Sequence, residues 1–478
     1  MALNSETGHA KKIIPSVFTA YLVLIINLYL NAQVCFTSQT SYVVGINPIS
    51  LCYADFNADG KIDLATANNS AGVGEISILL GSGTGSFSTS TSFAVGAIPR
   101  SLCTGDFNND GKPDLATNNT GPGNVSILLG NGAGGFTPGT DFTTSIFNFS
   151  SKISSADFNA DGFDDLVITS GSFFVLAALS NGNGSFAPTT SYTANNNTHT
   201  VITSDFNADG KIDLAVTTFN DSNFVTILPG DGMGGFGTPA SFSIGDFPAS
   251  LINADFNGDG KTDLASSNID NNITGNISVL LGNGIGSFSA FTNFGVGSAV
   301  VPNFICSADF DGDGNLDLAT ASIANNNSGN VTILPGNGAG NFGSPINFAV
   351  DSFPNSIIAA DFNADGKIDI ATATTQSNID SGIVSVLLNC NTTGTMQPEN
   401  ISDQLKVYPN PNNGFFHLST DAKNIKIKIS NVFGEIIHSS DINQEKIRID
   451  LSNQTNGIYF LRTYCNDRNL TNRKIIIQ

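Results

Sequence analysis

The segment Asp55-Phe56-Asn57-Ala58-Asp59-Gly60-Lys61-Ile62-Asp63-Leu64 decides the fold, because closely similar ten-residue segments occur six more times in the chain. The later copies begin at Asp106, Asp157, Asp205, Asp255, Asp309 and Asp361, at intervals of 51, 51, 48, 50, 54 and 52 residues. Every copy has an acid at positions one, five and nine, Phe at two, Asn or Asp at three and Gly at six. We call these segments acid loops 1 to 7. Their regular spacing predicts a repeat architecture.

The spacing of the acids within each loop predicts a cation site. In a tightly curled segment, alternate side chains point to one centre, so the oxygens of Asp55, Asn57, Asp59 and Asp63 can converge, with the Lys61 carbonyl as a further ligand. Oxygen ligands without His or Cys favour Ca²⁺, and the loop resembles the first nine positions of an EF-hand loop without its final Glu. The alternative is an acidic turn that needs no ion, although three neighbouring carboxylates repel each other unless a cation is present.

We therefore expect up to seven Ca²⁺ ions. The candidate ligands are the residues at positions one, three, five, seven and nine of each acid loop, position seven contributing its backbone carbonyl. They are Asp55, Asn57, Asp59, Lys61, Asp63, Asp106, Asn108, Asp110, Lys112, Asp114, Asp157, Asn159, Asp161, Phe163, Asp165, Asp205, Asn207, Asp209, Lys211, Asp213, Asp255, Asn257, Asp259, Lys261, Asp263, Asp309, Asp311, Asp313, Asn315, Asp317, Asp361, Asn363, Asp365, Lys367 and Asp369.

The distribution of charge separates a large acidic part from a small basic part. Residues 1–400 contain 9 Lys+Arg and 33 Asp+Glu, whereas residues 401–478 contain 10 and 7, which gives net charges of −24 and +3 and the total of −21. Of the 33 acids, 22 are ligand positions of the acid loops. The acidity argues against nucleic acid or an anionic membrane as a partner of the large part, since both need clustered Lys and Arg.

Residues 1–32 have the features of an export signal. Lys11 and Lys12 precede a largely apolar run from Ile13 to Leu30, and Ala32 suits a cleavage site. The run is long for a signal, so a membrane anchor is the alternative. The chain has no second apolar run of that length, and we expect no transmembrane segment in the mature protein.

Four short strands are expected in each repeat. In the first, Ser50 to Ala54, Leu64 to Ala67, Ile76 to Leu80 and Phe87 to Val95 are apolar or alternating segments separated by turn residues. Four strands in a period of about 50 residues are typical of a propeller blade. The fold class expected is therefore all-β, a seven-bladed β-propeller followed by a small β-sandwich.

The repeats resemble the FG-GAP/VCBS family, which contains the calcium-loop propeller repeats of integrin α subunits and of many bacterial surface proteins. The resemblance covers roughly residues 36–390 and depends on the loop acids, the Phe at position two and a Gly-x-Gly-x-Gly-x-Phe turn such as Gly81 to Phe87. The third repeat departs from this pattern, with Ser180 to Phe186 in place of the turn and Phe163-Asp164 inside the loop. These departures put the turn geometry of the third repeat in doubt.

The seventh repeat ends early, at Asn389-Cys390, without the Gly-rich turn and the fourth strand. The N-terminus has a matching surplus, because Phe36 and Tyr42 repeat the six-residue spacing of Phe87 and Phe93. We therefore expect the mature N-terminus to supply the outer strand of the last blade and to close the ring.

The six cysteines fall into three groups. The same register places Cys390 at the position of Ser82 and Cys35 at that of Ser86, on the two sides of one turn, and predicts a disulfide worth roughly 5 kcal/mol. Two free thiols are the alternative. Cys52, Cys103 and Cys306 each precede an acid loop by three residues, and we expect them to be small buried residues on equivalent strands. Cys465 stands alone near the C-terminus.

Residues 391–402 are a polar linker, and residues 403–478 form a separate module. Its segments Leu405 to Pro411, Ile425 to Ile429, Gly457 to Arg462 and Lys474 to Ile477 alternate like strands and predict a small antiparallel sandwich. The module resembles the type A sorting domain of the type IX secretion system of Bacteroidota, through its Tyr-Pro-Asn-Pro start, central Gly and Gly-Ile-Tyr strand. The resemblance implies export by that machinery and a secreted or outer-membrane-attached location. An accessory sandwich without a sorting role is the alternative.

The sequence argues against catalysis. After the signal only His199, His417 and His438 remain, which leaves no plausible His-based relay, and the chain has no Trp for stacking on sugars. The first hypothesis is thus a non-catalytic calcium-binding adhesion or recognition propeller (residues 33–390) for an extracellular protein or glycan. The alternatives are a secreted polysaccharide-active enzyme and a purely structural surface spacer.

Overall fold

The computed structural model describes residues 34–70, 72–147, 151–219, 223–269, 275–297, 300–324, 328–375, 381–391, 406–408, 414–419, 425–431, 436–442, 446–454, 457–465 and 468–477. The predicted signal, residues 1–32, lies outside these ranges, as does the linker after residue 391. The described residues form strands, turns and bends and contain no helix. Accordingly, no described segment is a helix of the length and apolar character needed to cross a membrane.

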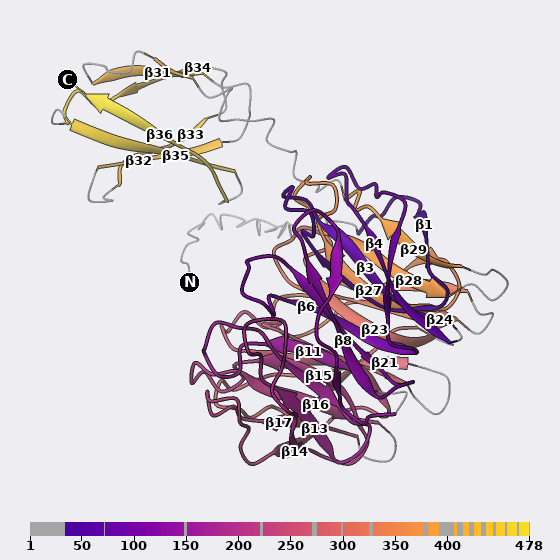
Figure 1. Ribbon diagram of the computed structural model, residues 1–478. Helices are drawn as coiled ribbons and strands as arrows, with labels where there is room; N and C mark the ends of the chain where they lie inside the picture. The colour runs from indigo at the N-terminus through magenta and orange to yellow at the C-terminus, as the bar shows by residue number, and fades with distance from the viewer. Residues whose placement is uncertain are drawn as a thin grey trace, which may run out of the picture.

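Seven antiparallel sheets follow the seven repeats, and we call them repeat sheets 1 to 7 (Figure 1). Sheets 1 to 6 take their strands from consecutive segments. These are β2 (Pro48–Ala54), β3 (Asp63–Ser70), β4 (Val73–Leu79) and β5 (Thr91–Val95); β6 (Pro99–Gly105), β7 (Asp114–Asn119), β8 (Asn124–Gly130), β9 (Phe136–Pro138) and β10 (Phe142–Thr143); β11 (Ile153–Ala156), β12 (Asp165–Thr169), β13 (Phe174–Ala178) and β14 (Thr190–Thr193); β15 (Thr198–Ser204), β16 (Asp213–Thr218), β17 (Phe224–Leu228) and β18 (Ala240–Ser243); β19 (Pro248–Ala254), β20 (Asp263–Ile269), β21 (Gly275–Leu280) and β22 (Thr292–Gly295); and β23 (Val300–Ala308), β24 (Asp317–Ala324), β25 (Gly329–Leu334) and β26 (Ile346–Val350).

Sheet 7 combines the two ends of the repeat region. It consists of β27 (Pro354–Ala360), β28 (Asp369–Thr375), β29 (Gly382–Leu387) and the N-terminal strand β1 (Thr40–Val44), which pairs antiparallel with β29. Tyr42 is opposite Val384 in this register. The prediction that the N-terminus supplies the outer strand of the last repeat is therefore confirmed.

The second strand of each repeat sheet is covered on both faces. In β3 the first six residues, Asp63 to Asn68, are all buried, so the usual alternation of buried and exposed residues is absent. The covering residues come from neighbouring sheets. One apolar cluster joins Ala65 and Ile76 of sheet 1 to Leu115 of sheet 2, and another joins Leu64 of sheet 1 to Val384 of sheet 7. Burial of this apolar surface is the main favourable contribution to packing between the sheets.

One backbone hydrogen bond is repeated between successive sheets. The third Gly of a Gly-rich turn, or its equivalent, donates its N–H to a carbonyl of the previous repeat. The acceptor is the Phe at position two of that repeat's acid loop, and for the first repeat it is in acid loop 7. The donor and acceptor pairs are Gly85 and Phe362, Gly134 and Phe56, Gly184 and Phe107, Gly234 and Phe158, Gly286 and Phe206, and Gly340 and Phe256, at 2.9 to 3.1 Å. The first of these pairs connects sheet 1 to sheet 7.

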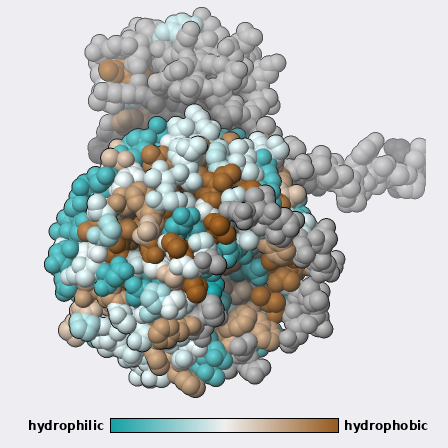
Figure 2. Space-filling model, turned by 45° about the vertical axis from the view of Figure 1, so that its right-hand side comes forward, coloured by the Kyte–Doolittle hydropathy of each residue, from teal (hydrophilic) through white to brown (hydrophobic). Residues whose placement is uncertain are grey.

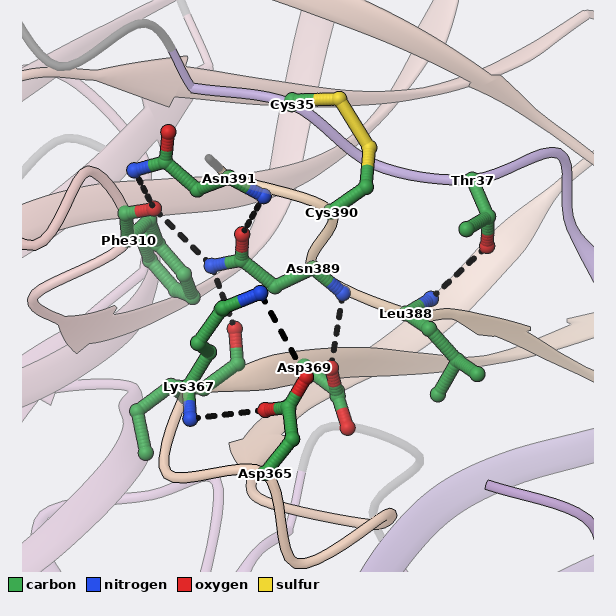
Figure 3. The surroundings of a disulfide bond; sticks show 11 residues. Cys35, Thr37, Phe310, Asp365, Lys367, Asp369, Leu388, Asn389, Cys390 and Asn391 are labelled. Atoms are coloured by element: carbon green, nitrogen blue, oxygen red, sulfur yellow. Dashed lines mark hydrogen bonds and ion pairs between the residues drawn. A yellow bond between two sulfur atoms is a disulfide. The ribbon is translucent and has the colours of Figure 1, made fainter. Parts of the chain in front are cut away.

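Side-chain amides replace this bond where the turn is missing (Figure 3). The Phe310 carbonyl accepts hydrogen bonds from Asn389 Nδ2 at 2.9 Å and from Asn391 Nδ2 at 3.5 Å. Both Asn residues follow β29, in sheet 7, whereas Phe310 belongs to acid loop 6. Sheets 6 and 7 are thus connected at the same carbonyl as the other neighbours, although the chain there has no Gly-rich turn.

The predicted disulfide between Cys35 and Cys390 is present, with the two Cα atoms 5.1 Å apart (Figure 3). The Cys390 N–H donates to the Cys35 carbonyl at 2.9 Å, the same bond that Ser82 makes to Ser86. The two cysteines therefore rebuild the two sides of the missing turn. Cys52, Cys103 and Cys306 are free thiols on the equivalent strands β2, β6 and β23, as expected, but the three residues are half-buried and not fully buried.

The turn of the third repeat, which the sequence left in doubt, matches the others. Ser180 and Phe186 form the antiparallel bridge that Gly81 and Phe87 form in the first repeat. The Asn181 N–H donates to the Ser185 carbonyl at 2.9 Å, as Ser82 does to Ser86. The two Gly residues with positive φ in this turn, Gly182 and Gly184, are kept.

The C-terminal module consists of two antiparallel sheets (Figure 1). One contains β30 (Lys406–Tyr408), β31 (Phe415–Ser419) and β34 (Lys446–Asp450), and the other contains β33 (Ile436–Ile442), β32 (Ile425–Ser430), β35 (Gly457–Cys465) and β36 (Arg468–Ile477). Phe416 and Ile449 of the first sheet share a buried cluster with Ile427, Leu461 and Ile475 of the second. This arrangement agrees with the predicted small sandwich.

Candidate metal centres

The side chains at positions one and three of each acid loop point into the loop, as the spacing predicts. In acid loop 1, the Asp59 N–H donates to Asp55 Oδ1 and to Asn57 Oδ1, both at 3.0 Å, and the Gly60 N–H donates to Asp55 Oδ2 at 2.8 Å. Gly60 has a φ of 79°, the left-handed conformation that Gly adopts without strain. Acid loops 2 to 7 repeat these bonds. Two or more ligand oxygens therefore face one centre in each loop.

The Asp at position nine is buried and bonded to two backbone groups. Asp63 is 0 % exposed; its Oδ2 accepts from the Phe56 N–H at 2.9 Å and its Oδ1 accepts from the Gly81 N–H at 2.7 Å. The other six loops keep both bonds, and Ser180 and Asn389 replace the Gly in repeats 3 and 7. This carboxylate thus fixes the acid loop to the Gly-rich turn, a role that its sequence position does not reveal.

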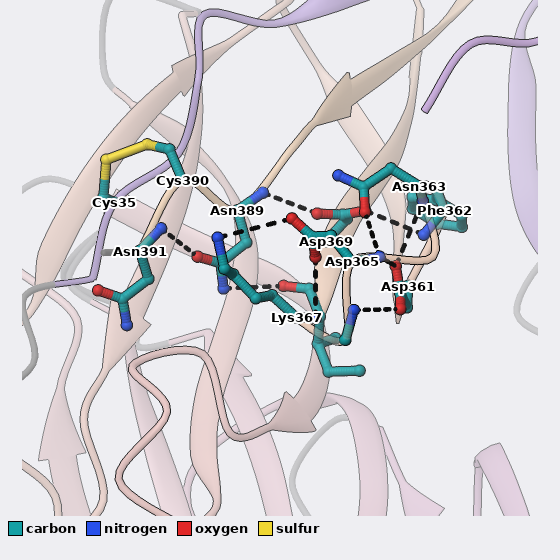
Figure 4. A network of polar contacts seen from close by, with 12 residues as sticks. Cys35, Asp361, Phe362, Asn363, Asp365, Lys367, Asp369, Asn389, Cys390 and Asn391 are labelled. Atoms are coloured by element: carbon teal, nitrogen blue, oxygen red, sulfur yellow. Dashed lines mark hydrogen bonds and ion pairs between the residues drawn. A yellow bond between two sulfur atoms is a disulfide. The ribbon is translucent and has the colours of Figure 1, made fainter. Parts of the chain in front are cut away.

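Five loops supply a cation of their own. The ammonium group of the Lys at position seven lies 3.0 to 3.8 Å from the carboxylate at position five, as Lys61 Nζ does from Asp59 Oδ2. Figure 4 shows the equivalent pair of Lys367 and Asp365 in acid loop 7. The Lys61 ammonium lowers the pKa of Asp59. The sequence prediction considered only the carbonyl of this Lys and missed its side chain, although the two-residue spacing from the Asp carries the signal.

Acid loop 6 is the one loop with an acid at position three. It has Asp311 there and Asn315 at position seven, so it has four carboxylates and, like acid loop 3, no Lys. One ligand oxygen from each of Asp309, Asp311 and Asp317 lies within 4.8 Å of the other two. Among the described residues, this is the single such group of three or more Asp, Glu, His or Cys side chains. Burial, with the neighbouring carboxylates, raises the pKa of Asp311 to about 6 and that of Asp317 to about 7.

These donor sets fit a hard divalent cation. All the side-chain atoms that face the loop centres are carboxylate or amide oxygens, the ligands that Ca²⁺ prefers. Nearby carboxylates that raise each other's pKa, as in acid loop 6, are stabilised when a cation binds between them. The Asp at position nine differs from the other predicted ligands because it is buried and accepts a hydrogen bond from the Gly-rich turn outside the loop. Ligation by each of the predicted residues stays a prediction.

Acid loop 3 brings in one acid that the prediction omitted. Asp164 Oδ2 accepts a hydrogen bond from the backbone N–H of Asp106 at 2.9 Å, which connects acid loop 3 to acid loop 2. Burial raises the pKa of Asp164. The departure Phe163-Asp164 from the repeat pattern was its signal in the sequence.

Family models match both parts of the chain. The model described as FG-GAP-like repeat matches residues 55–117, 157–216, 205–266, 255–320 and 309–372, together more than half of the chain. The model described as secretion system C-terminal sorting domain matches residues 406–478. The two matches agree with the two resemblances seen in the sequence. A search of curated proteins finds no match.

Among solved structures, the chain is similar to a "putative 6-phosphogluconolactonase" from Bacteroides uniformis. The TM-score is 0.45 and the identity 15%, over 66% of this chain and 98% of the other. At this level the similarity carries no functional argument.

Proposed function

Because this chain belongs to the FG-GAP-like repeat family, we propose that its repeat sheets form a calcium-stabilised, seven-bladed propeller that recognises an extracellular protein or glycan. The C-terminal sorting domain indicates a secreted or cell-surface protein of Bacteroidota that engages the type IX secretion machinery. We place the signal peptide at residues 1–32, the propeller at 33–390, the linker at 391–402 and the sorting domain at 403–478.

The closed ring is supported by the contacts between the first and last sheets. The Gly85 to Phe362 hydrogen bond and the apolar cluster that contains Leu64 and Val384 have the same form as the contacts between consecutive sheets. With the Phe310 carbonyl bonded at the junction of sheets 6 and 7, each of the seven junctions has one such bond. A cyclic order of seven sheets accounts for all of them.

Calcium is the proposed ion because the loops offer only hard oxygen donors. If the extracellular calcium concentration is about ten times the Kd of a site, each ion stabilises the fold by about 1.4 kcal/mol, or about 10 kcal/mol for seven independent sites. Such an ion would hold the candidate ligands at positions one, three, five, seven and nine of the loop together. Position nine already connects the loop to its sheet.

Recognition is proposed at the distal end of the repeat sheets, which we define as the end away from the acid loops. The large apolar side chains exposed there include Phe147, after β10, which is 62 % exposed, and Phe173, between β12 and β13, which is 61 % exposed. Figure 2 shows one face of the molecule, where apolar residues are interspersed with polar ones. Exposed aromatic side chains set in a polar surface are typical of protein and glycan contacts.

A non-catalytic function is supported by the contacts that the loop acids make. The acids of the loops are bonded to backbone groups or to Lys, an arrangement that holds a scaffold together. The test is an array of glycans and outer-membrane proteins, probed with the chain from residue 33 onward, with and without calcium. We expect calcium-dependent binding that Phe147→Ser and Phe173→Ser weaken and that Met233→Ser, at the acid-loop end, does not. Turnover of a polysaccharide, or no binding in calcium, would contradict the proposal.

A further inference from the structure

The residue that follows the disulfide, Asn391, is bound to the backbone of acid loop 6. It is buried, and its Nδ2 donates a hydrogen bond to the carbonyl of Asp311 and also, at 3.5 Å, to the carbonyl of Phe310. Asp311 is the candidate calcium ligand at position three of the loop. Asn391 lies outside the seven acid loops, so a residue that the repeat pattern does not include contacts this candidate metal centre.

Asn389 makes a second contact with the same loop. It is buried, and its Nδ2 donates to the Phe310 carbonyl at 2.9 Å. Its Oδ1 accepts a hydrogen bond from the backbone N–H of Asn391 at 2.8 Å, so the two Asn residues hold each other in place (Figure 3). The Asn389 N–H also donates to Asp369 Oδ1 of acid loop 7 at 2.7 Å (Figure 4). Residues 389–391 therefore connect two neighbouring acid loops.

The disulfide holds this segment from the other side. Cys390 lies between the two Asn residues and is bonded to Cys35. The residues on either side of Cys35 pack against acid loop 6 as well. Val34 and Phe310 belong to one buried apolar cluster, and the Phe36 ring contacts the Phe310 ring edge-on at a centroid distance of 6.1 Å. Both chain segments that the disulfide joins therefore contact acid loop 6 at Phe310.

Phe310 lies between two candidate ligands, Asp309 and Asp311. A shift of its backbone would move both carboxylates, and one oxygen of each lies within 4.8 Å of the other and of an Asp317 oxygen. Contacts that hold ligands in their binding geometry reduce the free energy spent on ordering a site when the ion binds. In the other acid loops, the Phe at position two accepts a hydrogen bond from the backbone N–H of a Gly-rich turn instead. Acid loop 6 is thus the loop in which this carbonyl is held by the disulfide-bonded segment.

We propose that Asn389 and Asn391 position the ligands of acid loop 6, and that the Cys35–Cys390 disulfide and calcium binding at this loop are coupled through them. The proposal rests on the calcium binding proposed above and names one way in which it is regulated. With the disulfide intact, the contacts to the loop backbone are held and calcium binds tightly. With both cysteines reduced, the segment 389–391 loses its covalent attachment to the N-terminal segment, and the calcium Kd of acid loop 6 rises.

The coupling acts in both directions. If the disulfide tightens calcium binding at acid loop 6 by some factor, calcium must favour the disulfide over the two thiols by the same factor. Reduction by a dithiol breaks the S–S bond and transfers two electrons and two protons to the cysteines, while the dithiol closes to a cyclic disulfide. The equilibrium ratio of reduced to oxidised dithiol at which half of the protein disulfide is lost therefore measures this factor independently of a calcium titration.

The first test measures calcium binding by calorimetric titration of the mature chain. The step that belongs to acid loop 6 is the one that Asp311→Asn weakens. We expect Asn391→Ala and Cys35→Ser/Cys390→Ser each to raise the Kd of this step about fivefold or more, and their combination to add little, because both act through the same contacts. Asn131→Ala is the matched control and should change it less than about twofold, because the Asn131 side chain accepts hydrogen bonds from its own Gly-rich turn in the second repeat.

The second test measures the disulfide of the native chain. The chain is equilibrated with mixtures of reduced and oxidised dithiothreitol, and the surviving Cys35–Cys390 bond is quantified by alkylation and mass spectrometry of peptides. Saturating calcium should raise the ratio of reduced to oxidised dithiol at half loss about fivefold or more. Asp311→Asn should remove most of this effect, whereas Asn57→Ala, at the same position of acid loop 1, should leave most of it.

The outcomes separate the coupling from calcium binding itself. A native chain that binds no calcium would contradict both the proposed function and the coupling. Calcium binding at acid loop 6 that is the same with and without the disulfide would overturn the coupling alone. Equal losses of the dithiol effect in Asp311→Asn and Asn57→Ala would also overturn it, because calcium would then protect the disulfide only by stabilising the whole fold.

Discussion

The backbone N–H of Gly85 donates to the carbonyl of Phe362 at 3.0 Å, although 277 positions separate the two residues along the chain. Gly85 belongs to the turn of sheet 1 and Phe362 to acid loop 7. The same bond joins sheets that are neighbours in sequence, so the two ends of the repeat region meet as any two consecutive repeats do.

The disulfide at the junction should contribute strongly to stability. It closes a loop with a sequence separation of 355, for which the chain-entropy model gives roughly 5 kcal/mol, less any residual structure in the unfolded chain. We expect the double variant Cys35→Ser/Cys390→Ser to unfold at a clearly lower guanidinium concentration than the native chain. Cys52→Ala, which removes a free thiol, is the control. An unchanged midpoint in the double variant would show that the noncovalent contacts suffice.

The N-terminal strand should depend on Phe36 for its attachment. The Phe36 ring contacts Phe348 and Phe310 edge-on, at centroid distances of 5.0 and 6.1 Å. We expect Phe36→Ala to lower the free energy of unfolding by about 3 kcal/mol, the lower end for buried Phe, because the ring is only partly buried. Val43→Ala, at a side chain that is 63 % exposed, should change it by less than about 0.5 kcal/mol. Equal effects in urea denaturation would contradict this assignment.

Asp59 and Asp63 of acid loop 1 should respond differently to replacement by Asn. Asp63→Asn replaces a carboxylate that accepts two backbone hydrogen bonds by an amide whose NH₂ faces a donor, which should cost about 1–3 kcal/mol even without calcium. Asp59 is exposed and paired with Lys61, so Asp59→Asn should cost little in calcium-free buffer. Urea midpoints of both variants, with and without calcium, check this difference. A larger calcium-free loss in Asp59→Asn would reverse the roles.

Calcium should stabilise the chain, and acid loop 6 should bind it most tightly. This loop has an acid, Asp311, at position three and lacks the Lys that competes for the acid at position five in five of the other loops. We expect a chelator to lower the melting temperature markedly. Calorimetric titration should show one site that binds calcium most tightly, and Asp311→Asn should weaken binding at that site. Asn57→Ala, at the same position of acid loop 1, is the control and should weaken it less. A melting curve that is the same in chelator and in calcium would contradict ligation.

The calcium-free chain should lose stability as the pH rises. Burial raises the pKa of Asp317 to about 7 and those of Asp114, Asp165 and Asp369 to about 6, whereas an unfolded Asp titrates near 3.9. Between these values the folded state binds more protons than the unfolded state, so stability falls from about pH 4 to about pH 7. Urea midpoints at pH 5 and pH 7.5 test the sign, and calcium should reduce the loss because it binds the ionised loops. A midpoint that rises with pH in calcium-free buffer would show that the buried acids are stabilised as anions.

Much of the architecture was readable from the repeat alone. The fixed period, the position of Phe36 and Tyr42 and the early end at Cys390 predicted the strand order of sheet 7 and the disulfide, because a repeat assigns each residue to an equivalent place. The loop acids were readable as a convergent set for the same reason. The ion pair between Lys61 and Asp59 is local, and the two-residue spacing would have sufficed to find it.

The sequence by itself determined which residues are equivalent, because local spacing sets the strands, the curled loops and the register of pairing. Only the tertiary structure decided what each equivalent residue contacts. Asp63 connects the acid loop to the Gly-rich turn, and the Asn389 amide replaces a missing Gly N–H. These contacts join residues that are distant along the chain, and the packing of one sheet against the next determines them.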